Sequence, residues 1–309
     1  MAVTAAMVKE LREMTGAGMM DCKKALTAVD GDMDKAVEFL REKGLAAAAK
    51  KAGRIAAEGL VKTIVDGKKA VVVEVNSETD FVAKNADFQA YVAQVAAQAM
   101  ATSAADIDAF LEEPWSEDPS LTVAQALSEK ISVIGENLKI RRFEKVDAGD
   151  GLVVDYIHGG GRIGVLVQAE APENDAAKEA LKNIAMQIAA MRPQYVSRDE
   201  VSDEFLNHER EILMAQIMND PKESSKPEKV IKGMIEGRIS KEMKDICLLD
   251  QVYVRAEDGK QTVGKYLQEV SKAAGAPVVL KKFVRFETGE GLQKKEEDFA
   301  AEVAKQMNK

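Results

Sequence analysis

A carboxylate and an aromatic ring stand side by side at Asp80 and Phe81, within the segment Ser77–Ala86. This pair directly follows a strongly patterned β-hairpin, and its position indicates a protruding recognition loop. Thr79 to Lys84 fall between an expected strand and an expected helix, where rigid scaffolds commonly display functional residues. From the pattern alone, a buried core position for Phe81 is nevertheless favoured over an exposed one, because aromatic side chains are mostly buried.

The elements on both sides of this segment have clear signals. Two apolar runs, Leu60–Val65 and Ala70–Val75, flank Asp66-Gly67. They predict a hairpin, since both turn residues tolerate a positive φ. An amphipathic helix is expected next, capped by Asn85 or Asp87. Its apolar stripe consists of Phe88, Tyr91, Val92, Val95 and Ala99.

Other chemistry-bearing patterns are weak. The glycine-rich stretch Gly159–Gly164 resembles a phosphate-binding loop, but it lies between two expected strands instead of opening a helix, so a hairpin turn is favoured. His158 and His208 are the two histidines, and no ligand-spaced cluster surrounds them. We therefore expect no metal and no cofactor. Cys22 and Cys247 lack CxxC spacing, which favours reduced, buried thiols.

Composition narrows the class of partner. The net charge is −9 and no basic block is interleaved with aromatics, so direct nucleic-acid binding is disfavoured and a protein partner is expected. No apolar run approaches the roughly 18 residues needed to cross a bilayer, and no long apolar signal core begins the chain. A cytoplasmic protein without membrane contact is the expectation.

The first fifty residues predict three short helices. Their apolar stripes are Met7, Val8, Leu11 and Met14, then Cys22, Ala25, Leu26 and Val29, then Met33, Val37 and Leu40. The third helix is expected to stop at Gly44, and a helical linker with Lys50, Lys51 and Arg54 follows. Met19 and Met20 at the turn between helices suit either a partner contact or the small core.

The chain repeats itself with a period of 93 residues. The helix segment Phe88–Ala97 aligns with Leu181–Ala190, and the hairpin before it aligns with Leu152–Ala169. Each copy closes with an Arg-Phe-Glu strand, at Leu138–Val146 and Lys281–Glu287. This order favours two related α+β subdomains, each a small antiparallel sheet covered by helices on one face, over a parallel sheet.

A charged insertion interrupts the second copy. Asp203–Met218 and Pro227–Met243 have helical patterns, and the turn-forming segment Asn219–Lys226 separates them. They predict an antiparallel helical hairpin.

Two long segments, Lys9–Leu26 and Val75–Lys84, form specific signatures, and shorter ones are Ile134–Asn137, His158-Gly159, Arg162–Val165, Arg285–Glu287 and Gly289–Gly291. Through these segments the sequence resembles the bacterial translation elongation factor Ts family over essentially its full length. The segment Ala104–Ser120, with Pro114-Trp115, looks longer than in short members of the family.

The resemblance implies an α+β architecture. It combines an N-terminal three-helix bundle of the ubiquitin-associated type, two related core subdomains with small antiparallel sheets, an inserted coiled-coil hairpin and a C-terminal helix. The implied boundaries are 1–55 for the bundle and linker, 56–146 for the first core subdomain, 147–195 with 247–290 for the second, 196–246 for the hairpin and 291–309 for the C-terminal module.

The resemblance also implies a function. The family binds elongation factor Tu and accelerates GDP release, which requires no chemical active site. Asp80 and Phe81, within Thr79–Val82, would enter the nucleotide-binding domain and disturb its Mg²⁺ and phosphate sites. Further implied contacts are Met19, Met20, Lys23, Ile134, Gly135, His158 and Gly159, with the C-terminal segment Glu297–Met307.

Two other functions compete with exchange. One is a protein-binding scaffold of the ubiquitin-associated type without exchange activity, and the other is a nucleotide-dependent enzyme built on the glycine-rich stretch. The sequence also leaves open whether the protein acts as a monomer, a homodimer or a 2:2 complex with elongation factor Tu.

Overall fold

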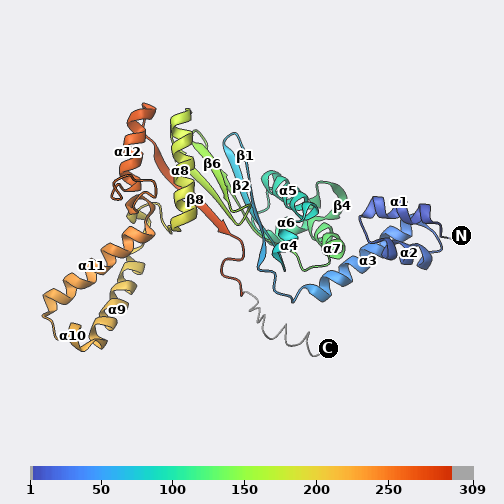
Figure 1. The fold of residues 1–309 in the computed structure, drawn as a ribbon, viewed down its shortest axis with the longest axis horizontal. Helices are drawn as coiled ribbons and strands as arrows, with labels where there is room; N and C mark the ends of the chain where they lie inside the picture. The colour runs from blue at the N-terminus through green and yellow to red at the C-terminus, as the bar shows by residue number, and fades with distance from the viewer. Residues whose placement is uncertain (1–2, 294–309) are drawn as a thin grey trace.

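The computed structural model describes residues 3–293 and has an elongated form (Figure 1). A helical bundle lies at one end and a helical hairpin at the other, with two three-stranded antiparallel sheets and their covering helices between them. This is the α+β architecture that the sequence predicts. The C-terminal helix expected in 291–309, including Glu297–Met307, lies almost entirely outside the described residues.

The N-terminal bundle consists of α1 (Ala5–Thr15), α2 (Met19–Ala28) and α3 (Met33–Lys51). Thr4 caps α1 through its side-chain oxygen, and Asp32 caps α3 in the same way. The packed interior includes Leu11, Cys22 and Leu26, none of which is exposed to solvent. The three predicted apolar stripes form one small core, as expected, except for Met14, which is 60% exposed.

The predicted stop of the third helix at Gly44 is wrong, because α3 continues unbroken to Lys51. Gly44 is buried against α7 (Val123–Ile134), where an added Cβ would lie 3.7 Å from the Ser128 carbonyl oxygen. Alanines follow Gly44 and favour the helix strongly. The glycine thus marks a contact between two helices, and the expected linker is the second half of α3.

The first sheet has the order β1-β2-β5, formed by β1 (Glu58–Asp66), β2 (Lys69–Ser77) and β5 (Lys139–Asp147). The predicted hairpin is confirmed, with Asp66 opposite Lys69. Helices α5 (Ala86–Ala101) and α7 cover one face of this sheet. The segment after α5 forms α6 (Ile107–Glu112), β3 (Pro114–Trp115) and β4 (Asp118–Thr122), and it buries Phe110 and Trp115 in the same core.

The second sheet repeats this plan with the order β6-β7-β8, formed by β6 (Leu152–His158), β7 (Ile163–Glu170) and β8 (Val279–Glu287). Helices α8 (Asp175–Met191) and α12 (Val263–Ala274) cover its outer face. The short helices η1 (Arg198–Glu200) and η2 (Leu248–Asp250) connect the hairpin region. Gly159, Gly160 and Gly161 all have positive φ between β6 and β7. The glycine-rich stretch is therefore a hairpin turn, as predicted.

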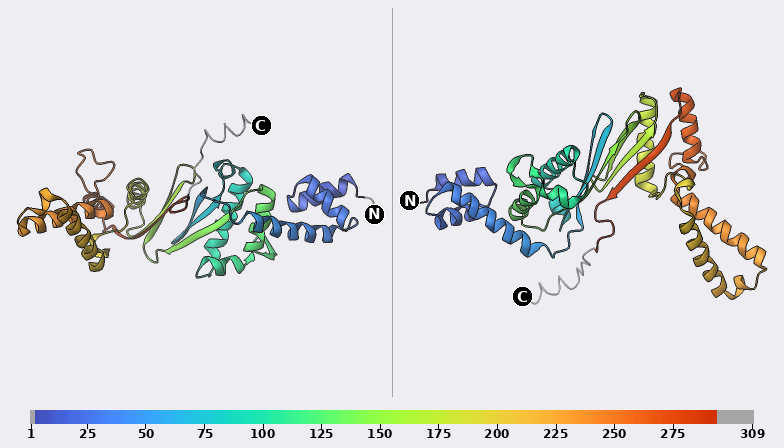
Figure 2. Two further views of the ribbon diagram at one scale, coloured as in Figure 1. Left: turned by 90° about the horizontal axis from the view of Figure 1, so that it is seen from below. Right: turned by 180° about the vertical axis from the view of Figure 1, so that it is seen from behind.

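The inner faces of the two sheets pack against each other. One buried cluster joins Val61 and Val72 of the first sheet to Val153, Leu166 and Phe286 of the second. Alternate residues of β2 point the other way, toward α5, so both of its faces are buried. The resulting order of layers is helices, sheet, sheet, helices (Figure 2). The sequence predicts helices on one face of each sheet but does not predict this contact.

The predicted helical hairpin is confirmed as α9 (Asp203–Asn219) and α11 (Glu228–Ile246), with the short α10 (Pro221–Ser224) at its tip. Its own apolar seam contains Ile217, Ile231, Ile235, Ile239 and Met243. At the root, the backbone nitrogen of Leu248 donates to the Tyr195 carbonyl oxygen over 2.9 Å. The two segments that flank the hairpin are thus hydrogen-bonded to each other independently of its helices.

Deleting Asp203–Met243 and closing the gap with a short Gly/Ser linker is expected to leave the two-sheet core folded. The hairpin buries its apolar residues mainly against itself, whereas the root keeps its backbone hydrogen bonds. Denaturant unfolding should remain one cooperative transition, within about 2 kcal/mol of the full-length value. Loss of that transition would show that the hairpin is integral to the core.

None of the helices in the described part of the chain has the length and apolar character to cross a membrane. Cys22 and Cys247 are free and buried, as predicted, and burial raises the pKa of both thiols.

Candidate functional site

The predicted recognition segment forms a short helical turn, α4 (Asp80–Ala83), between β2 and α5. The Thr79 side chain caps its start by accepting from the Val82 backbone nitrogen over 3.4 Å. Asn85 then caps α5 by accepting from the backbone nitrogens of Asp87 and Phe88. Thr79 and Asn85 thus cap two successive helices within the segment between strand and helix. These caps fix the backbone of the turn and with it the direction of each side chain.

Phe81 projects from this turn with 80% of its surface exposed. Ala83 is buried, and Val82 packs against the core of the first subdomain. A single helical turn turns successive side chains to different faces, so Val82 and Ala83 anchor it while Phe81 faces solvent. The pattern-only expectation of a core position for Phe81 is therefore wrong.

Asp80 lies beside Lys84 on the exposed side of the turn, with 2.7 Å between Oδ2 and Nζ. The hydrogen bond from Lys84 lowers the pKa of Asp80, so its carboxylate is charged at neutral pH. Lys84 Nζ also lies 5.9 Å from the centre of the Phe81 ring. Because both charged groups are well exposed, this pair contributes little to folding and remains available to a partner.

Glu136, which the sequence did not single out as a site residue, connects the turn to the end of α7. Its Oε2 accepts from the backbone nitrogens of Glu78 and Thr79 over 3.1 and 3.0 Å, and its Oε1 accepts from Thr79 Oγ1 over 2.7 Å. In return, Glu78 Oε1 accepts from the Asn137 backbone nitrogen over 2.6 Å. The pairing joins segments far apart in the chain, so local patterns carry no sign of it.

Ile134 and Gly135 end α7 directly before this contact. Gly135 adopts a φ of +87° and closes the helix by donating to the Ile131 carbonyl oxygen. Val133 is 41% exposed and faces Gly16 at the turn between α1 and α2. The end of α7 therefore lies between the N-terminal bundle and α4, which brings Ile134 and Gly135 close to the recognition turn.

His158 and Gly159 lie exposed where β6 meets the glycine turn. His158 Nδ1 is 3.0 Å from the hydroxyl of Tyr156. The neighbouring Gly160 and Gly161 share a small cavity with Gln89 of α5, whose side chain donates to the Ala83 carbonyl oxygen over 3.3 Å. Gln89 thus lies between the glycine turn of the second subdomain and the last residue of α4.

Met19, Met20 and Lys23 lie on the exposed face of α2, and the structure does not bring them next to α4 (Figure 1). The two methionines are 56% and 61% exposed. The alternative that they fill the core of the bundle is therefore wrong. They form a separate apolar surface at one end of the molecule.

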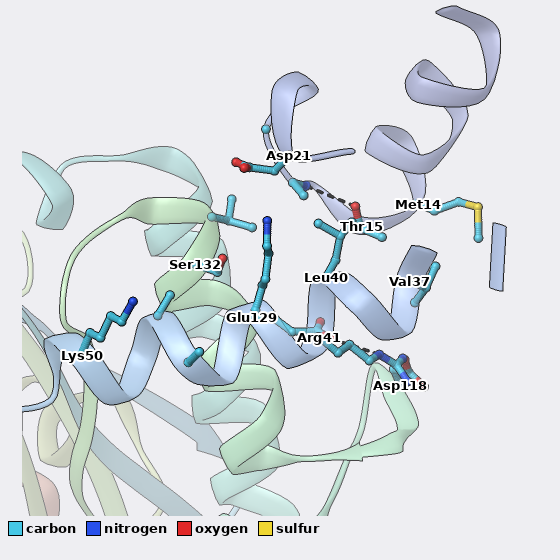
Figure 3. Close-up of a pocket in the computed structure, with 16 residues that line it drawn as sticks. Met14, Thr15, Asp21, Val37, Leu40, Arg41, Lys50, Asp118, Glu129 and Ser132 are labelled. Atoms are coloured by element: carbon cyan, nitrogen blue, oxygen red, sulfur yellow. Dashed lines mark hydrogen bonds and ion pairs between the residues drawn. The ribbon is translucent and has the colours of Figure 1, made fainter. Parts of the chain in front are cut away.

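A pocket of about 470 Å³ separates the bundle from the core (Figure 3). Arg41 of α3 crosses beside it, 3.3 Å from Asp118 and 3.2 Å from Glu129. Met14, Val37 and Leu40 supply apolar lining. None of the predicted site residues lines this pocket, so it is a junction between bundle and core and not part of the recognition turn.

The arrangement is suited to contact with a macromolecule. An exposed ring and an adjacent carboxylate stand on a turn whose backbone is held by hydrogen bonds on both sides. Within residues 3–293, no group of three or more His, Cys, Asp or Glu side chains is placed to hold a metal ion.

Comparison with known proteins agrees with the resemblance. A family model described as elongation factor Ts matches residues 78–290. Elongation factor Ts of Clostridium novyi (strain NT) is 54% identical over 309 residues, which cover 99% of both chains. The proteins of the same description from Clostridium tetani and Clostridioides difficile are 53% and 52% identical, again over 99% of both chains.

Proposed function

The chain belongs to the elongation factor Ts family, and from this premise we propose that it is the guanine nucleotide exchange factor for elongation factor Tu. It binds elongation factor Tu·GDP, promotes release of GDP and thereby allows GTP to bind. It performs no bond-breaking chemistry of its own and acts in the cytoplasm during protein synthesis.

The mechanism rests on thermodynamic linkage. A factor that binds the nucleotide-free form of its partner more tightly than the GDP form must lower the affinity for GDP by the same ratio. Contacts made equally in both forms give affinity without exchange. Exchange therefore requires a wedge, meaning side chains of the factor that fit into the partner only where nucleotide and Mg²⁺ have been displaced.

The observation that carries the proposal is the exposed Phe81 on a fixed turn. Full burial of a phenylalanine ring is worth roughly 1.5 to 3 kcal/mol, which can offset part of the distortion of a nucleotide site. Asp80 beside it would act as a polar clamp near the Mg²⁺ and phosphate groups. Thr79 and Val82 would hold these two side chains at the required angle.

Other surfaces would add affinity around this wedge. Ile134 and Gly135 directly precede Glu136, which accepts a hydrogen bond from the turn. His158 and Gly159 directly precede the two glycines that share a cavity with Gln89, and we expect both pairs to extend the contact around Phe81. The exposed Met19, Met20 and Lys23 form a second contact on the bundle. The domain boundaries given above, and the oligomeric state of the complex, are part of this working hypothesis.

The test is release of fluorescent GDP from elongation factor Tu in the presence of excess unlabelled nucleotide. Catalytic amounts of the protein are expected to accelerate release many-fold, because each molecule dissociates when new nucleotide binds. Binding without acceleration would favour the scaffold function. Conversion of the nucleotide itself would favour an enzyme, and either result would overturn the proposal.

A further inference from the structure

We propose that Glu136 is a positioning residue for exchange: it holds the turn that presents Phe81, without itself touching the partner's nucleotide site. This inference rests on the proposed function and extends it to a residue outside the recognition turn. It concerns how the wedge is kept rigid.

The first argument is the size of α4. A helix of four residues cannot be stable alone, because the cost of forming the first turn exceeds the gain from its few hydrogen bonds. Its shape must come from tertiary contacts. The Glu136 carboxylate supplies three of them, to two backbone nitrogens and to the hydroxyl of the capping Thr79.

The second argument is the reciprocal geometry. Glu78 reaches from the turn to the Asn137 backbone, while Glu136 reaches back to the turn, so the two segments are joined from both sides. Ser77 Oγ also donates to the Thr79 carbonyl oxygen over 2.9 Å. Thr79 is thus held through its nitrogen, its hydroxyl and its carbonyl group, directly before Asp80 and Phe81.

The expected effect of removing the Glu136 side chain depends on the step of exchange at which the turn must be ordered. A loose turn must be ordered when Phe81 enters the partner, and that entropic cost falls on the nucleotide-free complex and not on initial docking. The maximal rate of GDP release should therefore fall strongly. The protein concentration that gives half-maximal release should change less. The fall should be about tenfold, comparable to the loss of one hydrogen bond to a charged group.

Three variants separate positioning from a general loss of stability. Glu136→Ala removes all three acceptor contacts. Glu136→Gln keeps one oxygen, which can still accept from both backbone nitrogens, and should retain most of the maximal rate. Glu170→Ala is the control, because Glu170 is an exposed glutamate on β7 that pairs with Lys281 away from the turn. It should match the unsubstituted protein.

Two readouts test the inference. In GDP release, Glu136→Ala should reduce the maximal rate of the otherwise native protein but add little in a Phe81→Ala background, because it acts through that ring. In amide hydrogen exchange without a partner, Glu78 and Thr79 should lose protection in Glu136→Ala, while Val72 in the centre of β2 keeps it.

Unchanged maximal release, equal reductions in both backgrounds, or unchanged protection at Glu78 and Thr79 would each overturn the inference. Failure of the unsubstituted protein to accelerate release would instead overturn the proposed function. The hydrogen-exchange result still decides in that case whether Glu136 positions the turn.

Discussion

Replacing Phe81 with alanine is expected to slow maximal GDP release from elongation factor Tu by about tenfold to a hundredfold while leaving the folding of this protein almost unchanged. The ring is 80% exposed, so its removal creates no cavity. If the ring is buried only in the nucleotide-free complex, its removal destabilises that state alone, by roughly 1.5 to 3 kcal/mol. Each tenfold change in rate corresponds to about 1.4 kcal/mol.

The measurement pairs stimulated GDP release with thermal unfolding of the free protein. Phe88→Ala serves as the structural control, because Phe88 is completely buried under the first sheet and its loss should cost about 3 to 5 kcal/mol. A comparable loss of stability in Phe81→Ala would contradict the exposed position. An unchanged release rate would contradict the wedge.

Replacing Glu74 with alanine is expected to destabilise the fold by about 3 to 5 kcal/mol, the usual cost of breaking a buried ion pair from one side. Glu74 is completely buried in β2. It accepts from Arg141 at 3.0 Å, from Arg142 Nε at 2.6 Å and from the Gly289 backbone nitrogen at 2.8 Å. Its removal would take the buried carboxylate away from two guanidinium groups, which keep only contacts to Glu287 and Glu290, and would leave the Gly289 backbone N–H without its acceptor.

The position of Gly289 makes this contact sensitive to the second subdomain as well. Gly289 follows β8, has a φ of +71°, and lies so near Ala57 that an added Cβ would be 2.0 Å from the Ala57 carbonyl oxygen. Glu74 therefore joins the end of the last strand to the middle of the first sheet. Water can replace the contacts of an exposed ion pair when that pair is broken, but it does not replace the contacts of the buried Glu74 carboxylate.

Urea unfolding of Glu74→Ala and Glu74→Gln measures the effect, with Glu144→Ala as the matched control. Glu144 lies on the neighbouring β5 and pairs with Lys282 in a partly exposed position, so its loss should cost less than about 1 kcal/mol. Glu74→Gln should fall between the two. If Glu74→Ala is no less stable than the control, the cluster contributes nothing to the fold.

Much of the architecture could be predicted because its signals are local. The Asp66-Gly67 turn defines the first hairpin, helical spacing defines α5, and the alignment of Phe88–Ala97 with Leu181–Ala190 shows that the second sheet repeats the first. Each of these depends on residues close together in the chain, or on a comparison of the chain with itself.

The features that could not be predicted depend on contacts between distant segments. Gly44 has the pattern of a helix end, and only its contact with α7 explains why the helix continues. The role of Glu136 depends on the hydrogen bond between its carboxylate and Thr79, which lies far away in the sequence. The exposure of Phe81 contradicts the general tendency of aromatic rings to be buried. Only the resemblance to a family predicts that this ring is exposed, because no local pattern distinguishes a ring kept for a partner from a ring of the core.

The contact between the inner faces of the two sheets has a consequence for the origin of the chain. A gene encoding only one copy of the repeated unit would produce a protein with an uncovered apolar sheet face, and another copy of the same unit provides a matching surface. Such a protein would have to pair with a second copy to cover that face. Fusion of the two copies makes that association independent of protein concentration, and leaves each half free to diverge. Only the first half has a helical turn between its second strand and its long helix, and only the second carries the inserted hairpin.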